Sequence, residues 1–251
     1  MKNKFIIDFH THVGSCQKCG MLCNVKSMIK IMDKADIKIA CISNVFWNDF
    51  WVGNKIVYET IKKHPGRFIG FFYVNLQFPK LIYKELKKGI ERLGFSALKI
   101  YPIYDNIPVT DERWKPIFRF AEERNMIILS HTEENNNLCA PEIFLKIAKK
   151  YKNIKWVLAH SGVFPSGRKS AVMVAKKCDN VYLEISSSYE NFRSIEELVE
   201  GAGEDRVLFG SDMPLMDPRI HIGRVVTAEI SDIAKEKILG LNASNLLNIK
   251  I

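Results

Sequence analysis

Three side chains that can serve a metal centre alternate near the start of the chain, in the segment Asp8-Phe9-His10-Thr11-His12. Successive side chains of a β-strand point to opposite faces, so Asp8, His10 and His12 would all project to one side. Two neighbouring imidazoles can chelate one metal ion. The plainer interpretation is the ordinary polar and apolar alternation of a half-buried strand.

Similar side chains end three later strand-like runs, as His131, His160 and Asp212, and Lys99 lies near the end of another. A lone histidine at a strand end is usually a hydrogen-bonded structural residue. Several histidines and an aspartate at the ends of neighbouring strands are instead typical of a metal centre. We therefore predict a metal site at one end of a set of strands.

Eight short runs rich in apolar and β-branched residues recur along the chain at nearly even spacing. Several are continuously apolar, as in Ile39-Ala40-Cys41-Ile42, which is typical of parallel strands buried on both faces. Amphipathic stretches of helical length separate the runs, and one carries Ser194 and Glu197 at the spacing of a capping box. The runs cover residues 5–12, 38–45, 68–74, 96–101, 126–131, 155–160, 180–186 and 206–211.

Eight alternating strand and helix units in 251 residues predict an α/β fold, a (β/α)8 barrel of the TIM type, formed as a single domain over residues 1–251. An open doubly wound sheet is less favoured, because no GxGxxG turn follows the first strand. The longest loops would lie at the C-terminal rim, where barrel active sites are found, and cover residues 13–24, 101–109 and 213–223.

The composition is ordinary for a globular protein, with 47% hydrophobic and 26% charged residues. The formal net charge of +9 comes from lysines spread over helix-like segments, so we do not expect nucleic acid as a partner. No stretch is apolar for the roughly 18 residues that a membrane helix needs, and residues 1–4 leave no room for a signal core. We expect a cytoplasmic protein with a small-molecule substrate and leave a homodimer open.

The six cysteines are expected to be reduced thiols in that compartment. Cys16, Cys19 and Cys23 have a spacing that resembles a metal site. A closed structural zinc site needs four ligands, however, and no fourth is evident nearby. A rim loop that carries reduced thiols is the favoured interpretation.

The chain resembles the amidohydrolase superfamily, and within it the amidohydrolase-2 branch, which includes aminocarboxymuconate semialdehyde decarboxylase. The resemblance extends over the whole length, and its motifs are specific in combination. They are Ile7-Asp8-Phe9-His10-Thr11-His12, Gly94-Phe95-Ser96-Ala97-Leu98-Lys99-Ile100-Tyr101-Pro102, Leu158-Ala159-His160-Ser161-Gly162, Phe209-Gly210-Ser211-Asp212-Met213-Pro214 and Asn242-Ala243-Ser244-Asn245-Leu246-Leu247.

This resemblance implies that His10, His12, His131 and Asp212 bind a divalent metal, usually zinc in this branch. One ion is favoured and two remain open. The resemblance also implies that His160 and Asp212 are the catalytic residues, with His160 beside a metal-bound water. The donor chemistry agrees, because three imidazoles and a carboxylate suit zinc and leave one position for water or substrate. Zinc would lower the pKa of that water towards about 7 and polarise a substrate carbonyl.

Lys99 has two interpretations. In binuclear members of the superfamily a carboxylated lysine at this position bridges two metals, and His160 would then bind the second. In single-metal members the lysine can remain an ammonium that contacts substrate or an acidic neighbour. Other candidate substrate contacts are Tyr101, Arg168, Arg219 and Arg224.

Three further features invite a role. Glu184 is a carboxylate inside an apolar strand and needs a partner, for which Lys99 is a candidate. Glu133 follows His131 by two residues, although its surroundings resemble a solvated loop. The aromatic side chains Trp47, Phe50 and Trp51 could line the pocket mouth or a dimer contact.

The leading functional expectation is a metal-dependent hydrolase that acts on a C–N or C–O bond of a small anionic amide, lactone or ester. The alternative is a non-oxidative decarboxylase of an unsaturated or aromatic carboxylic acid. A TatD-like nuclease also begins with a histidine pair, but such a nuclease would have a glutamate ligand at the position where this chain has Lys99. A non-catalytic barrel is disfavoured because every expected ligand position is intact.

Overall fold

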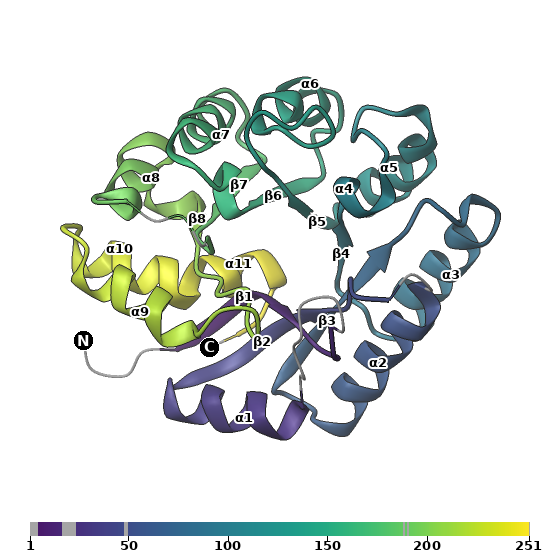
Figure 1. Cartoon of the computed structure of the whole chain (residues 1–251), viewed down its shortest axis with the longest axis horizontal. Helices are drawn as coiled ribbons and strands as arrows, with labels where there is room; N and C mark the ends of the chain where they lie inside the picture. The colour runs from purple at the N-terminus through teal and green to yellow at the C-terminus, as the bar shows by residue number, and fades with distance from the viewer. Residues whose placement is uncertain (1–4, 17–23, 48–49, 188, 190, 251) are drawn as a thin grey trace.

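The computed structural model describes residues 5–16, 24–47, 50–187, 189 and 191–250. Eight parallel strands follow one another in sequence order around a single sheet, and helices cover its outside (Figure 1). This confirms the predicted barrel. The strands are β1 (Ile6–His12), β2 (Ile37–Ser43), β3 (Phe68–Val74), β4 (Ala97–Ile100), β5 (Ile127–His131), β6 (Lys155–Ala159), β7 (Val181–Glu184) and β8 (Val207–Leu208).

The helices connect successive strands or follow the last strand, so most of them lie in the outer ring of Figure 1. Helix α5 illustrates why they pack there, because its apolar residues Ile117, Phe118, Phe120 and Ala121 are all buried. The helices are α1 (Val25–Lys34), α2 (Phe50–Lys63), α3 (Pro79–Arg92), α4 (Pro102–Asp105), α5 (Lys115–Glu122), α6 (Phe144–Lys150), α7 (Pro165–Lys177), α8 (Ser194–Ala202), α9 (Pro218–Thr227), α10 (Asp232–Glu236) and α11 (Asn242–Leu247).

Two apolar layers explain the continuously hydrophobic strands. Ile39 and Cys41 of β2 belong to a cluster that also contains Phe9 and Phe71 from other strands. Ala40 and Ile42, which alternate with them, belong to the larger cluster that includes helix residues. Each strand is therefore buried on both faces, as the predicted parallel barrel requires.

Strand β1 meets the chain that leaves β8, and this seam completes the ring. The amide of Asp212 donates to the carbonyl of His10 at 2.8 Å, and the amide of His12 donates to that of Met213 at 2.7 Å. The Asp8 carboxylate reinforces the seam, since it accepts hydrogen bonds from the Ser211 amide and hydroxyl. His10, His12 and Asp212 therefore lie on the two edges that close the barrel.

The predicted capping box at Ser194 and Glu197 is wrong. Arg193 occupies the N-cap position of α8, and no side-chain cap is present. The Ser194 hydroxyl instead accepts from Arg224 at 3.1 Å, and Glu197 pairs with Arg168 at 2.7 Å. Charge-assisted bonds to arginines of neighbouring helices replace the local cap.

Two other sequence-based expectations concern the cysteines and membranes. Cys41, Cys139 and Cys178 are buried free thiols, as expected. Cys16 is disulfide-bonded, so the expectation of reduced thiols is wrong at that position. Cys19 and Cys23 lie outside the described residues. Among the described helices, none combines the length and apolar character that crossing a bilayer demands.

Candidate metal centre

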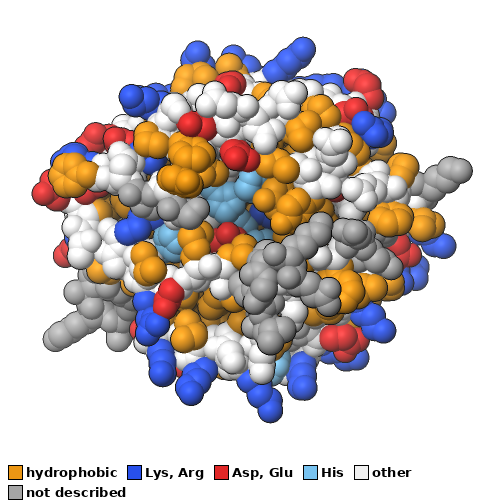
Figure 2. All heavy atoms as spheres, in the orientation of Figure 1, with side chains coloured by type: hydrophobic (Ala, Val, Ile, Leu, Met, Phe, Trp, Pro, Cys, Tyr) orange, Lys and Arg blue, Asp and Glu red, His pale blue; other side chains and the backbone are white. Residues whose placement is uncertain are grey.

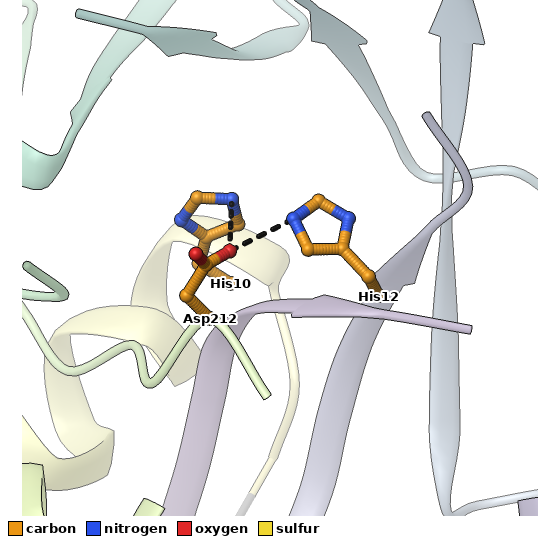
Figure 3. Close-up of side chains that lie close together, drawn as sticks. All are labelled: His10, His12 and Asp212. Atoms are coloured by element: carbon orange, nitrogen blue, oxygen red, sulfur yellow. Dashed lines mark ion pairs between the residues drawn. The ribbon is translucent and has the colours of Figure 1, made fainter. Parts of the chain in front are cut away.

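His10, His12 and Asp212 converge at the seam, with ligand atoms that all lie within 4.8 Å of one another (Figure 3). Asp212 Oδ1 is 2.9 Å from His12 Nε2 and 3.6 Å from His10 Nε2. The two histidines come from alternate positions of β1, and Asp212 lies four residues after the end of β8. The structure therefore brings together three of the four predicted metal ligands.

The chemistry of this trio fits a divalent cation. Asp212 Oδ1 is buried and has no hydrogen-bond partner among the described residues. Burial alone would raise the pKa of Asp212, but the contact with His12 and the nearness of His10 hold it below its ordinary value. The group thus offers an anionic oxygen and two imidazole nitrogens, a donor set suited to zinc or manganese.

His10 has a different partner on each ring nitrogen. Its Nδ1 lies 2.9 Å from Glu184 Oε2, while its Nε2 lies 2.9 Å from Lys99 Nζ. The sequence suggests Lys99 as a partner for Glu184, but the two residues instead contact opposite nitrogens of the His10 imidazole. Burial lowers the pKa of His10 and also lowers the pKa of Lys99 to about 8.

His160 begins a short 3-10 turn (His160–Gly162) directly after β6. Its Nδ1 lies 2.9 Å from the Ser186 carbonyl, which can only accept, so Nδ1 carries the proton and Nε2 is left as an acceptor. The His160 ring centre lies 4.9 Å from that of His10 and 4.8 Å from that of His131. His160 therefore adjoins the metal site.

Both proposed catalytic residues leave their strands with left-handed backbone, at φ 64° for His160 and φ 58° for Asp212. Non-glycine residues in sparsely populated backbone regions cost of the order of 1–3 kcal/mol each. Such conformations persist only where the surrounding fold enforces them. The barrel stabilises an unfavourable turn at these two positions, which orients both side chains at its mouth.

His131 does not join the trio among the described residues. Its ring stacks on Tyr101 at 4.2 Å between centres, and Tyr101 stacks in turn on Tyr104 at 4.0 Å. Glu133 Oε2 lies 4.0 Å from His131 Nε2, so that carboxylate shares its surroundings. His131 remains a predicted ligand, and Tyr101 forms part of the aromatic wall beside it.

An aromatic cavity of about 90 Å³ lies next to this wall. Its lining includes Phe46, Trp47, Tyr73 and Tyr104. The Phe46 ring also packs against His12, with centres 5.3 Å apart, so one residue of the cavity lining contacts the metal site. The space-filling view shows histidine side chains at the bottom of a hollow bordered by hydrophobic side chains (Figure 2).

The candidate arginines have protein partners of their own. Arg168 is 4% exposed and bonds to Glu197 and Asn191, so it joins α7 to α8. Arg219 pairs with Asp217 at the exposed start of α9. Of the aromatic candidates, Trp51 lies under the ammonium of Lys88, and the side chain of Phe50 lies outside the described part of the chain.

Sequence reasoning missed His221 of α9. Its Nδ1 lies 2.8 Å from Arg224, which also donates to the Ile185 carbonyl beside β7. Its buried Nε2 has no partner among the described residues, and burial lowers the pKa of His221 to about 4. The one available signal was a histidine within the rim segment 213–223.

A family model described as Amidohydrolase matches residues 47–249 of the chain. The chain belongs to this family of enzymes. Among curated proteins, gamma-resorcylate decarboxylase of Polaromonas sp. (strain JS666 / ATCC BAA-500) is 23% identical over 259 residues. That match covers 78% of this chain and 75% of the decarboxylase.

Solved structures with the same fold include 5-carboxyvanillate decarboxylase from Sphingomonas paucimobilis, with a TM-score of 0.79 and 14% identity over 99% of this chain and 100% of that chain. Dihydroxybenzoic acid decarboxylase from Polaromonas sp. JS666, with bound manganese and the inhibitor 2-nitroresorcinol, matches with a TM-score of 0.79 and 16% identity over 98% of this chain and 97% of that chain. In this chain, His10, His12 and Asp212 form a group that could hold a metal ion. Zinc remains a prediction.

Proposed function

We propose that the chain is a metal-dependent, non-oxidative decarboxylase of an aromatic carboxylic acid. The observation that carries this proposal is the joint presence of a divalent-metal trio and a nearby cavity lined in part by aromatic rings, in a chain whose relatives include several decarboxylases. The relatives favour this alternative over the hydrolysis that we expected first. Hydrolysis of an amide or lactone remains the competing reaction.

The metal would be held by His10, His12 and Asp212, with His131 as a further predicted ligand. When bound, it would supply positive charge that draws the carboxylate and a neighbouring oxygen of the acid into one orientation. Tyr104, which is exposed and stacks on Tyr101, would hold the planar ring of the acid.

In the reaction the ring carbon that bears the carboxylate gains a proton. The bond from that carbon to the carboxylate then breaks, its electron pair restores the aromatic ring, and carbon dioxide leaves. We assign the proton transfer to His160 in its protonated form, which would carry the proton on Nε2, the ring nitrogen not engaged by the Ser186 carbonyl, and would regain it from water after the product leaves. The Asp212 anion adds negative charge near His160.

The test uses protein loaded with Mn²⁺ or Zn²⁺ and a panel of acids and hydrolase substrates. 2,6-Dihydroxybenzoate and 5-carboxyvanillate represent the acids, and simple aryl esters, lactones and cyclic amides represent the competing reaction. We expect carbon dioxide release from at least one acid and, in D₂O, one deuterium at the vacated ring carbon. Turnover of the esters, lactones or amides without carbon dioxide release from any acid would reject the proposal in favour of hydrolysis.

A further inference from the structure

Glu184 is a fully buried carboxylate at the end of β7, and every group around it donates a hydrogen bond. The amide of Ser186 donates to Oε1, and the amide of His160 donates to Oε2 at 3.2 Å. A backbone amide can only donate, so each carboxylate oxygen must accept. Backbone donors on both oxygens favour the ionised carboxylate over the carboxylic acid.

The ionised Glu184 determines which nitrogen of His10 carries the proton. Oε2 lies 2.9 Å from His10 Nδ1 and accepts, so Nδ1 must donate. The opposite nitrogen gives the same answer independently, because Lys99 Nζ, which has no acceptor role as an ammonium, lies 2.9 Å from Nε2. His10 Nε2 is therefore an acceptor and faces the Asp212 side of the site.

Ser186 extends this arrangement to His160. Its hydroxyl donates to Glu184 Oε2 at 2.8 Å, which turns its lone pairs towards His10 Nδ1 at 3.3 Å and His160 Nδ1 at 3.1 Å. The ligand atoms of His10, His160 and Glu184 also lie within 4.8 Å of one another. Because these hydrogen bonds connect and satisfy them, we regard this second group as a hydrogen-bonded support and not as a second cation site.

The space around Glu184 is closed by Gly210, which lies two residues after the end of β8. A Cβ at Gly210 would lie 2.3 Å from Glu184 Oε1 and 2.9 Å from His10 Cβ. Real Cβ atoms essentially never approach other atoms this closely, so only glycine fits without movement. The backbone at Gly210 therefore packs directly against the Glu184 carboxylate and restricts its position.

We propose that Glu184 is a positioning residue that fixes the tautomer of His10, which commits Nε2 of His10 to the metal, and that orients the Ser186 hydroxyl beside His160. The proposal rests on the metal site assigned under the proposed function. It assigns Glu184 a role that depends on its charge and on its acceptor-only character. A carboxylate behind a metal-binding histidine fixes its orientation and raises its basicity.

Glutamine is a sharp probe because it has the same shape but one oxygen and one NH₂ group. With its oxygen towards His10, the NH₂ group opposes the Ser186 amide, donor against donor. With its NH₂ group towards His10, it opposes the His160 amide and drives the His10 proton to Nε2, where it blocks the metal. Neither orientation reproduces the native pattern.

The experiment compares Glu184→Gln with Glu196→Gln. Glu196 is also a buried glutamate that accepts from a backbone amide, that of Glu229 at 2.8 Å, but it lies in α8. We expect Mn²⁺ affinity by calorimetry to fall about 10- to 100-fold in Glu184→Gln and to stay within about twofold in Glu196→Gln. Equal affinity in Glu184→Gln and the native protein would overturn the proposal.

A second measurement uses the native protein without metal and does not depend on whether the variant folds. Nitrogen-15 NMR of the imidazoles, with the His10 signals assigned by their loss in His10→Gln, reports which nitrogen carries the proton. We expect Nδ1–H for His10. Finding Nε2–H would overturn the proposal. Both measurements use no substrate, so a failure to decarboxylate any acid would count against the proposed function alone.

Discussion

Lys99 Nζ lies 2.9 Å from His10 Nε2, the same nitrogen that faces Asp212. An ammonium at this place occupies the lone pair that a metal would need, and its charge repels a cation nearby. A carboxylated Lys99 would have the opposite effect, because it would present oxygen ligands. The two interpretations of Lys99 therefore predict opposite effects on metal affinity. An ammonium would weaken metal binding, and a carboxylated lysine would strengthen it.

Replacement of Lys99 by methionine, which keeps much of the side-chain volume, is expected to raise Mn²⁺ affinity by about tenfold, equivalent to about 1.4 kcal/mol. Titration calorimetry in bicarbonate-free buffer would measure it, with Lys88→Met as the control, since Lys88 lies over Trp51 outside the site. A lower affinity in Lys99→Met, with bicarbonate strengthening metal binding to the native protein, would instead indicate a carboxylated lysine.

Removal of a proposed ligand should weaken metal binding more than removal of a supporting residue. His12→Ala is expected to lower Mn²⁺ affinity by more than the roughly 100-fold upper range for outer partners, and to abolish decarboxylation. The thermal stabilisation that added Mn²⁺ gives to the native protein should vanish with it. His64→Ala is the matched control, because His64 directly follows α2 and its ring contacts Phe68. A comparable loss there would show that the effect is not specific to the trio.

Gly210→Ala should disturb the site because its methyl group would lie 2.3 Å from Glu184 Oε1. We expect lower Mn²⁺ affinity together with a lower denaturation midpoint in urea. Gly223→Ala in α9 is the control, since nothing lies within 4 Å of its added Cβ and alanine favours a helix by up to about 1 kcal/mol. Unchanged Mn²⁺ affinity and an unchanged urea midpoint in Gly210→Ala would mean that the segment after β8 can move away from Glu184 at little cost in free energy.

The buried Asp105 predicts a specific dependence of stability on pH. Burial raises the pKa of Asp105 from its ordinary 3.8 to about 7, although it accepts hydrogen bonds from the Tyr73 hydroxyl and the Leu76 amide. Between these two values the folded chain keeps a proton that the unfolded chain has released. The contribution of Asp105 to the free energy of unfolding therefore falls as pH rises through this window, by up to about 1.4 kcal/mol per pH unit.

Asp105→Asn removes this contribution and keeps the side-chain shape. Its stability relative to the native protein, measured by urea unfolding, should increase from pH 5 to pH 8. Asp111→Asn provides the contrast, because its hydrogen bonds to Arg113 lower the pKa of Asp111 to about 2. Its effect should be the same at both pH values, and a parallel response of the two variants would contradict the assignment to Asp105.

The barrel and its metal trio could be predicted from sequence because both follow from short patterns. Alternation in β1 places His10 and His12 on one side, and parallel strands carry their C-terminal residues to a common rim. The partners of Glu184 could not be predicted in the same way. Its bonds to His10 and Ser186 depend on rotamers and on the close approach of Gly210, which have no local signature.

The partners of the arginines also could not be predicted from sequence. Arg168 follows β6 in sequence, as a substrate-binding residue might be expected to do, yet its guanidinium points to Glu197 on α8. Side-chain direction along a helix decides between these outcomes, and sequence position alone does not give it. His221 was overlooked for a related reason, because it belongs to a helix and not to a strand end.

The seam between β1 and β8 gives the metal site a mechanical role as well. Strand β8 has only two residues, so the ring is weakly paired where its first and last strands meet. A cation held by His12 and Asp212 would connect β1 to the segment after β8 and so stabilise the junction that closes the barrel. Its loss should let the barrel open locally at the seam, so that the amide hydrogens of His12 and Asp212 exchange with solvent sooner than those of the central strands.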